Sequence, residues 1–227
     1  MGPQRKTTLV NDELYHVYSR SIAEYVVFND IKGYQRMIDM MNYCRYSNFE
    51  YEYSKFTKLD KSTQKIIIDK VRLENQKNAD IIAYCLMPTH YHIILKQISD
   101  GGIAKYIARV LNGYSKYFNT KHKRSGPLWA SRFKNVRVED DEQLQHLTRY
   151  IHLNPTSAGL VKNPEDWMFS SYGQYIQSNL SENEGICNYE NLIDIKPKEY
   201  QKFVNDRKAY QKDLALIKEK LFDNYSG

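Results

Sequence analysis

The chain has 227 residues, 41% of them hydrophobic, which is enough for one ordinary domain with an extension or for two small domains. It contains no apolar run of membrane-spanning length, and its polar start lacks the pattern of a secretory signal, so the sequence predicts a cytoplasmic protein with no membrane partner. The three cysteines, Cys44, Cys85 and Cys187, lie far apart and form no CxxC pair, which argues against a disulfide framework and against a structural zinc finger.

The net charge of +6 is concentrated in one segment of the chain. Residues 101–138 hold nine of the 33 Lys and Arg residues and no Asp or Glu, whereas the remainder has 24 basic and 27 acidic residues. Surface helices usually mix both signs, and a phosphate backbone is the commonest partner of such a basic run. The segment therefore predicts a polyanion-binding surface, with a solvated helix face as the alternative. The nine basic residues are Lys105, Arg109, Lys116, Lys121, Lys123, Arg124, Arg132, Lys134 and Arg137.

The N-terminal third of the chain predicts a strand, a helix and an insertion. Residues 13–22 alternate and are rich in aromatic and β-branched side chains, which is typical of a strand. Asn29 and Asp30 can cap a helix through residues 34–47, where apolar residues recur at helical spacing. Residues 50–78 are polar and Lys-rich around a short apolar kernel, and they predict a helical insertion.

The middle of the chain predicts a β-hairpin followed by a long helix. Residues 79–87 and 91–98 are two apolar strands joined by a turn in the sequence MPTH. Residues 103–122 place their apolar positions on one helical stripe, and SGP at 125–127 ends that unit.

The C-terminal part predicts one more strand and two helices. Residues 131–138 indicate a strand, and residues 139–154 a helix whose first, acidic residues suit the helix dipole. We expect Pro155 to end this helix. Residues 199–222 predict a charged amphipathic helix. The order strand, helix, hairpin, helix, strand, helix predicts an α+β fold with an antiparallel βαββαβ sheet and helices packed on it.

Two histidines one residue apart begin the second strand of the hairpin, in the stretch MPTHYHIIL. Alternate strand residues share a face, so His90 and His92 point the same way and could be two metal ligands on a rigid element. So short a pattern also occurs by chance. The alternative is two ordinary histidines, one packed and one exposed.

A third ligand is needed, and no Cys or further His stands at zinc-ligand spacing. Tyr150 and Asn154, at i and i+4 on the last helix of the core, share one face. Asn154 offers an amide oxygen and Tyr150 a phenol that can act as a nucleophile, and the set would suit Mg²⁺ or Mn²⁺. His152 should point off this face and pack or bind backbone. The chain has 20 tyrosines, so spacing alone does not select Tyr150.

Taken together, five stretches of the chain resemble the HUH single-tyrosine transposases, and within them the REP-associated tyrosine transposases. The resemblance covers about residues 10–175, and each stretch keeps its order and interval. The stretches are YHVYSR at 15–20, MPTHYH at 87–92, SGPLWASRFKNVRVED at 125–140, LTRYIHLNPTSAGLV at 147–161 and W…SSY at 167–172.

The resemblance implies a ferredoxin-like or RRM-like sheet and a site whose residues have assigned roles. It implies that His90 and His92 hold Mg²⁺ or Mn²⁺ with Asn154 as the third ligand. It implies that Tyr150 forms a 5′-phosphotyrosine with single-stranded DNA at a hairpin. Insertion-sequence relatives are dimers and REP-associated ones can act as monomers, so the resemblance leaves both states open.

The nucleic-acid surface follows from the basic segment. Helix 103–122 and strand 131–138 could lay Lys and Arg along a DNA backbone, and Arg20 is a further phosphate candidate. Trp129 and Phe133 are possible stacking platforms, with core packing as the alternative for both.

The sequence predicts a transposase-like domain at 1–175, with an insertion at about 50–78, and a C-terminal helical extension at 176–227. It departs from many relatives in reading SRSIAEY where they read RGN. Two other functions stay open: a domesticated protein that binds DNA or RNA hairpins without cleaving them, and a metal-dependent hydrolase that uses activated water.

Overall fold

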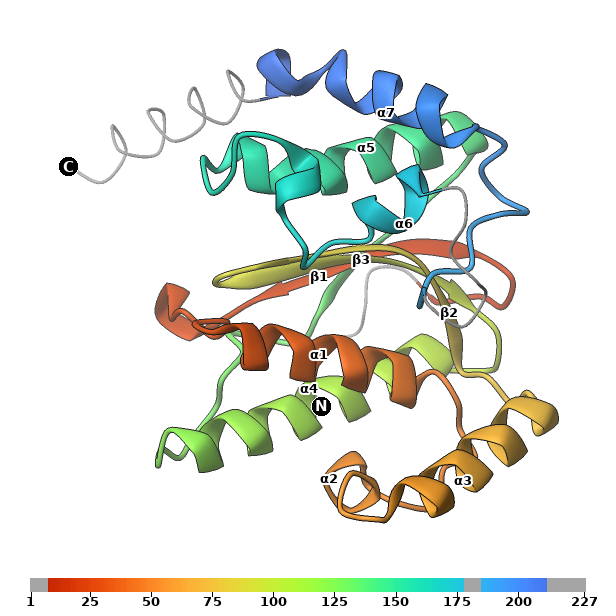
Figure 1. Ribbon diagram of the computed structural model, residues 1–227, viewed down its shortest axis with the longest axis vertical. Helices are drawn as coiled ribbons and strands as arrows, with labels where there is room; N and C mark the ends of the chain where they lie inside the picture. Colours follow the sequence, from red (N-terminus) through yellow and green to blue (C-terminus); the bar gives the residue numbers. More distant parts are fainter. Residues whose placement is uncertain (1–7, 178–184, 212–227) are drawn as a thin grey trace.

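One four-stranded antiparallel sheet lies between two layers of helices in the computed structural model, which describes residues 8–177 and 185–211 (Figure 1). The strand order is β2-β3-β1-β4. The strands are β1 (Leu14–Arg20), β2 (Ala79–Met87), β3 (His90–Gln97) and β4 (Lys134–Arg137). This is the antiparallel βαββαβ arrangement that the sequence predicts.

The two faces of the sheet are covered by different helices (Figure 1). One face carries α1 (Ile31–Cys44) and α4 (Gly102–Lys121), with α2 (Tyr53–Phe56) and α3 (Lys61–Glu74) of the insertion beside them. The other face carries α5 (Asp141–Ser157), on which α6 (Tyr172–Ile176) and α7 (Pro197–Asn205) pack. Two short 3-10 turns, η1 (Ile22–Glu24) and η2 (Pro164–Asp166), complete the described elements.

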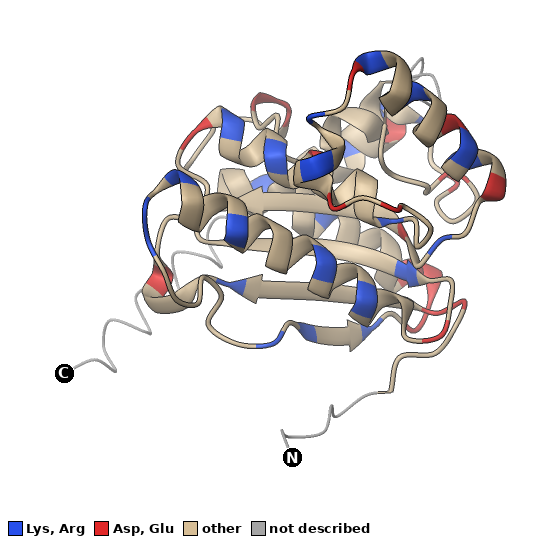
Figure 2. Ribbon diagram, turned by 90° about the horizontal axis from the view of Figure 1, so that it is seen from below, with Lys and Arg blue, Asp and Glu red and all other residues tan. Residues whose placement is uncertain are grey.

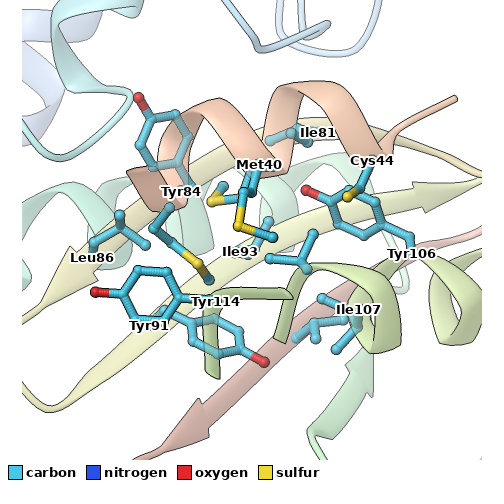
Figure 3. Close-up of a cluster of buried hydrophobic side chains, with 14 of the residues drawn as sticks. Met40, Cys44, Ile81, Tyr84, Leu86, Tyr91, Ile93, Tyr106, Ile107 and Tyr114 are labelled. Atoms are coloured by element: carbon cyan, nitrogen blue, oxygen red, sulfur yellow. The ribbon is translucent and has the colours of Figure 1, made fainter. Parts of the chain in front are cut away.

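Two separate apolar cores result from this layering. Between the sheet and the α1/α4 layer, fully buried aromatic, aliphatic and sulfur side chains pack together, Met40, Tyr91 and Tyr114 among them (Figure 3). Between the sheet and α5, the core is built on Ile94 and Ile151. Because both faces are covered, β2 is buried along its whole length and reads as a continuous apolar run.

The outer edge of β2 is also covered, although β2 is the end strand of the sheet. The backbone N–H of Ser171 donates to the carbonyl oxygen of Tyr84 at 2.9 Å, and the N–H of Asn188 donates to that of Ile81 at 2.7 Å. These contacts satisfy backbone groups that an open edge would expose to a second chain.

The beginning of α1 agrees with the predicted cap. The side chain of Asp30, not that of Asn29, accepts a hydrogen bond from the backbone N–H of Gly33 at 2.7 Å. The insertion is helical as predicted, in α2 and α3.

The end of α5 corrects one prediction, because the helix runs through Pro155 to Ser157. Proline near the end of a helix removes only one intrahelical hydrogen bond. The actual stop is Gly159, whose φ of 69° lies in the left-handed region. The N–H of Leu160 donates to the carbonyl oxygen of Pro155 at 2.9 Å, and that of Gly159 to Thr156 at 3.1 Å, which together form a Schellman motif.

Two other boundaries differ from expectation. The strand predicted at 131–138 is regular only over β4. The chain before β4 lies beyond the end of β1, where a single isolated bridge pairs Ser21 with Trp129. The helix predicted at 199–222 begins at Pro197 and is interrupted at residues 206–207, and its part beyond residue 211 lies outside the described residues. The domain division at residue 175 stays a prediction.

We expect Gly102→Ala to destabilise the fold. A methyl group at this position would lie 2.0 Å from the carbonyl oxygen of Asn78 and 2.9 Å from its carbonyl carbon. Because these are backbone atoms, relief requires a shift of the loop before β2, at a cost of roughly 1–3 kcal/mol. Urea unfolding measures it. The matched control is Gly173→Ala in α6. No atom would lie within 4 Å of the added methyl group there, so stability should hardly change.

Candidate active site

The β-hairpin places His90 and His92 on the face of the sheet that α5 covers. In the antiparallel register, His92 pairs with Tyr18 and His90 with Arg20, so all four side chains share that face. The two imidazole rings meet edge to face, with centroids 5.2 Å apart. The predicted common orientation of the two histidines is therefore found in the structure.

A cleft of about 710 Å³ opens between this part of the sheet and α5. It holds His90, His92, Tyr150 and Asn154, the set that the sequence singles out, although they come from two elements some sixty residues apart. The ring of Tyr150 lies edge-on to the ring of His92, with centroids 5.9 Å apart. Tyr150 is 39% exposed, so the side chain is not sealed in the core.

Each histidine of the pair has its Nδ1 engaged by a neighbour. Nδ1 of His92 lies 2.9 Å from Nε2 of His16, and Nδ1 of His90 lies 3.0 Å from Oγ1 of Thr89. On both rings, Nε2 is the nitrogen left for a ligand. His16 is a residue that the sequence analysis missed, although the alternation of β1 puts His16, Tyr18 and Arg20 on one face.

Burial keeps these histidines neutral. It lowers the pKa of His90 to about 4, with the charge of Arg20 adding to the effect and that of Glu24 opposing it. Burial also lowers the pKa of His92 well below its usual value, with help from His16, His90 and Arg20. The neutral imidazole is the form that binds a metal ion.

The phenol of Tyr150 stays protonated at neutral pH. Burial raises its pKa, and the neighbouring amide of Asn154 works in the opposite direction. The group is therefore a phenol, and its proton must leave when the oxygen forms a new bond.

The donor set fits a divalent cation. No three His, Cys, Asp or Glu side chains gather into a metal site within the described residues, so a third protein ligand would have to be of another type. The amide of Asn154 lines the cleft and offers an oxygen of the kind that hard cations bind. Two imidazole nitrogens and an amide oxygen suit Mn²⁺ or Mg²⁺ with positions left for phosphate oxygens.

His152 points away from the cleft, as predicted, but its partners are side chains and not the backbone. It is fully buried, with Nδ1 2.7 Å from the Tyr200 hydroxyl and Nε2 2.8 Å from Oγ of Ser171. The contact with Tyr200 ties α5 to α7, and the contact with Ser171 ties α5 to the segment that covers the edge of β2.

We expect the stability of the fold to fall in acid, in part through His152. Burial lowers the pKa of folded His152 to about 3, against an ordinary value of 6.5. The unfolded chain therefore takes up a proton below pH 6.5 that the folded chain does not, and the free energy of unfolding falls as the pH drops toward 3. Urea unfolding at several pH values measures the slope, which should become shallower in His152→Gln. The same slope in the variant would contradict this assignment.

Nine of the ten predicted DNA-binding cations, all except Arg137, fall into two groups on opposite faces of the sheet. Arg20, Arg132 and Lys134 line the cleft, and Arg20 also forms an exposed ion pair with Glu24. The basic residues of α4 lie on the other face, where Figure 2 shows Lys and Arg spread along the helices. The residues of that second group are Lys105, Arg109, Lys116 and Lys121, with Lys123 and Arg124 just after the helix.

Several of these cations already have protein partners. Lys116 forms an ion pair with Glu52 at 3.6 Å, and Lys121 forms one with Asp30. Arg109 donates to the carbonyl oxygen of Tyr46 at 2.7 Å. Further contacts join Lys105 to the carbonyl oxygen of Asp100, Arg124 to Asn119 and Pro127, and Arg137 to Glu13.

The two candidate stacking residues lie against the core between the sheet and α1/α4. The indole of Trp129 is partly buried and contacts the rings of Phe28, Tyr91 and Tyr114. Phe133 is partly buried against the same cluster. This placement agrees with the core-packing alternative for both residues.

Comparison with known proteins identifies the family. Residues 40–154, just over half of the chain, match the family model described as IS200-like transposase, and the chain belongs to this family. It is 29% identical over 112 residues to a provisionally named REP-associated tyrosine transposase of Haemophilus influenzae, covering 44% of this chain and 63% of the relative. It is 23% identical over 104 residues to the REP-associated tyrosine transposase of Escherichia coli, covering 45% of this chain and 59% of the relative. The matches thus span about three fifths of the length of these curated relatives.

A solved structure supports the fold. The chain aligns with a REP-associated tyrosine transposase bound to a REP hairpin, with a TM-score of 0.51 and 14% identity, covering 85% of this chain and 94% of the other. At this identity the likeness concerns the fold. In the part of the chain that the structure describes, no helix is both long and apolar enough to span a membrane.

Proposed function

We propose that this protein is a metal-dependent endonuclease and strand transferase that acts on single-stranded DNA through Tyr150. The observation that carries the proposal is the cleft itself. It brings a phenol on α5 against the ring of His92, beside a second imidazole and the amide of Asn154. Family membership supports a DNA-processing role.

In this proposal, the residues of the cleft divide the work. Nε2 of His90, Nε2 of His92 and the amide oxygen of Asn154 would hold Mg²⁺ or Mn²⁺. When bound, the cation would polarise the scissile phosphate and stabilise charge on the leaving oxygen. Tyr150 lines the same cleft as these three residues, so its phenol oxygen would attack the phosphate there.

The covalent step balances without an external energy source. The Tyr150 oxygen forms a bond to phosphorus, the bond from phosphorus to the 3′ oxygen breaks, and the phenol proton leaves to solvent. The leaving 3′ oxygen takes up a proton from solvent, so the products are a 5′-phosphotyrosine and a free 3′-OH. Because the phosphodiester energy is kept in the protein–DNA bond, a 3′-OH can later attack phosphorus and release Tyr150.

The substrate we propose is a DNA hairpin with a single-stranded flank. The structural relative was solved with a REP hairpin, and the two curated relatives are named after the same element. Arg20, Arg132 and Lys134 line this cleft, and we expect them to contact the phosphates of a strand that enters it.

We expect Arg132→Gln with Lys134→Gln to weaken binding of all single-stranded oligonucleotides alike. Removing two phosphate contacts should flatten the slope of log K against log salt by roughly 1.4. Fluorescence anisotropy at several salt concentrations measures this slope. The matched control is Lys105→Gln with Lys116→Gln on α4, and a larger change in that control would mean that the backbone runs along the opposite face.

Covalent capture tests the proposed function. Labelled hairpin oligonucleotides are incubated with the protein and Mn²⁺, and a denaturing gel separates free DNA from protein-linked DNA. The proposal predicts a labelled protein band that disappears with EDTA. Salt-sensitive binding without a band would favour a hairpin-binding protein that does not cleave, and cleavage without a band would favour a hydrolase that uses activated water.

A further inference from the structure

A third histidine, His16, lies beside the pair on β3. In the register of β1 against β3, His16 is opposite Ile94 and Tyr18 is opposite His92, so His16 is the diagonal neighbour of His92 on the α5 face. Nε2 of His16 lies 2.9 Å from Nδ1 of His92. His16 also lines the cleft.

The geometry of this contact is that of a hydrogen bond. The planes of the two rings are inclined by 21° to each other, and their centroids are 5.1 Å apart. This separation exceeds the N···N distance by about the width of one imidazole ring. The two nitrogens therefore face each other along the line between the rings, as donor and acceptor do.

The same geometry argues against a cation held between the two rings. Metal–nitrogen bonds of histidine are about 2.0–2.1 Å long, so two nitrogens on opposite sides of an ion would lie about 4 Å apart. Because the two nitrogens of His16 and His92 face each other at 2.9 Å, a cation does not fit on the line between them, whereas a proton does.

Which nitrogen carries that proton decides what His92 can do in the cleft. If Nδ1 of His92 donates to His16, the lone pair of His92 is on Nε2 and is available to a ligand. If His16 donates instead, neutral His92 carries its own proton on Nε2 and has no lone pair there. His90 has a matching neighbour, because the hydroxyl of Thr89 can accept from its Nδ1 at 3.0 Å.

We propose that His16 is a positioning residue, which accepts a hydrogen bond from Nδ1–H of His92 and so directs the Nε2 lone pair of His92 to a divalent cation. The inference rests on the proposed function, because it gives His16 a role toward the cation that His92 would hold. A ligating histidine usually donates its other N–H to a fixed acceptor, which sets its tautomer and ring orientation. Here the acceptor is His16 on the neighbouring strand β1. The register of β1 against β3 therefore sets the tautomer of His92.

The first test needs no metal. In the full chain with ¹⁵N-labelled histidine, long-range ¹H–¹⁵N correlation spectra report the tautomer of each ring. We expect the proton of His92 on Nδ1 in the wild type. His16→Phe keeps a ring but removes the acceptor, and it should shift His92 toward the Nε2–H tautomer. His16→Gln offers an amide oxygen as acceptor and should restore the Nδ1–H tautomer at least in part.

Two results of this test would overturn the proposal. One is a wild-type His92 with its proton on Nε2, which needs no variant and so does not depend on whether a variant folds. The other is an unchanged His92 tautomer in His16→Phe when its thermal melt shows a folded protein.

The second test measures the cation. In Mn²⁺ titrations followed by electron paramagnetic resonance, affinity should fall about 10–100-fold in His16→Phe and less in His16→Gln. Unchanged affinity in His16→Phe would overturn the positioning role. A wild type that binds no Mn²⁺ but shows the expected tautomer would contradict the proposed function, while the hydrogen bond from His92 to His16 would stand.

Discussion

Replacing Tyr150 with Phe is expected to abolish covalent capture of DNA, while binding of the same oligonucleotide stays within about twofold. The variant loses only the phenol oxygen, which is the proposed nucleophile, and loss of a covalent nucleophile typically costs at least ~10³-fold in rate. The ring remains, so its edge contact with His92 and the shape of the cleft are kept. Gel capture and fluorescence anisotropy on one oligonucleotide measure the two properties separately.

The matched control for this variant is Tyr51→Phe. Tyr51 is 38% exposed against 39% for Tyr150, but it lines a different cavity, between the insertion and α4. Full capture in Tyr51→Phe with none in Tyr150→Phe would assign the chemistry to one phenol. Loss of binding together with cleavage in Tyr150→Phe would instead mean that the hydroxyl holds DNA, and residual cleavage would favour an activated water.

The second large effect is expected at the histidine pair. In His92→Ala, Mn²⁺ affinity should fall by at least ~100-fold, because changes of a ligand's outer partners alone already cost 10–100-fold. Covalent capture at a fixed Mn²⁺ concentration should fall with it. Electron paramagnetic resonance titration reports the affinity, and thermal melts show whether the variant remains folded.

His146→Ala is the control for that experiment, since His146 is exposed on α5 and does not line the cleft. His90→Ala should resemble His92→Ala. In His90, as in His92, a neighbour engages Nδ1 and leaves Nε2 for the cation. If Mn²⁺ affinity survived in both cleft variants, the cation would have to bind elsewhere and the proposed ligand set would be wrong.

The periodicity of the sequence was sufficient to predict the sheet and its covering helices. Each pattern reports how many sides of an element are buried. The alternation over β1 and the apolar stripe of α4 indicate one buried side, and the continuous apolar run of β2 indicates two. Together with the element order, they predict a βαββαβ sheet. The end of α5 was mispredicted because the proline at 155 is a weaker stop in a last turn than the glycine at 159.

The site could be predicted only in part, for reasons of distance and direction. His90 and His92 share a strand and Tyr150 and Asn154 share a helix, so spacing relates the members within each pair. Nothing local relates one pair to the other, and the family resemblance carried that step. His16 was missed because its role depends on the register between β1 and β3, which strand patterns alone do not specify.

The basic segment shows a similar limit. Its nine cations lie in one segment of the sequence. Those of α4 lie over one face of the sheet, whereas Arg132 and Lys134 line the cleft on the other face, so the nine cations do not form one surface. Charge counting identified an excess of cations, whereas the face on which each cation lies is a property of the tertiary fold.

The most direct measurement is the position of the DNA on the protein after covalent capture. The adduct is trimmed with nuclease, digested with protease and analysed by mass spectrometry for a nucleotide-bearing peptide. We expect a single modified residue, Tyr150, among the 20 tyrosines of the chain. Attachment to Tyr18, which shares the cleft, or to any other residue would contradict it.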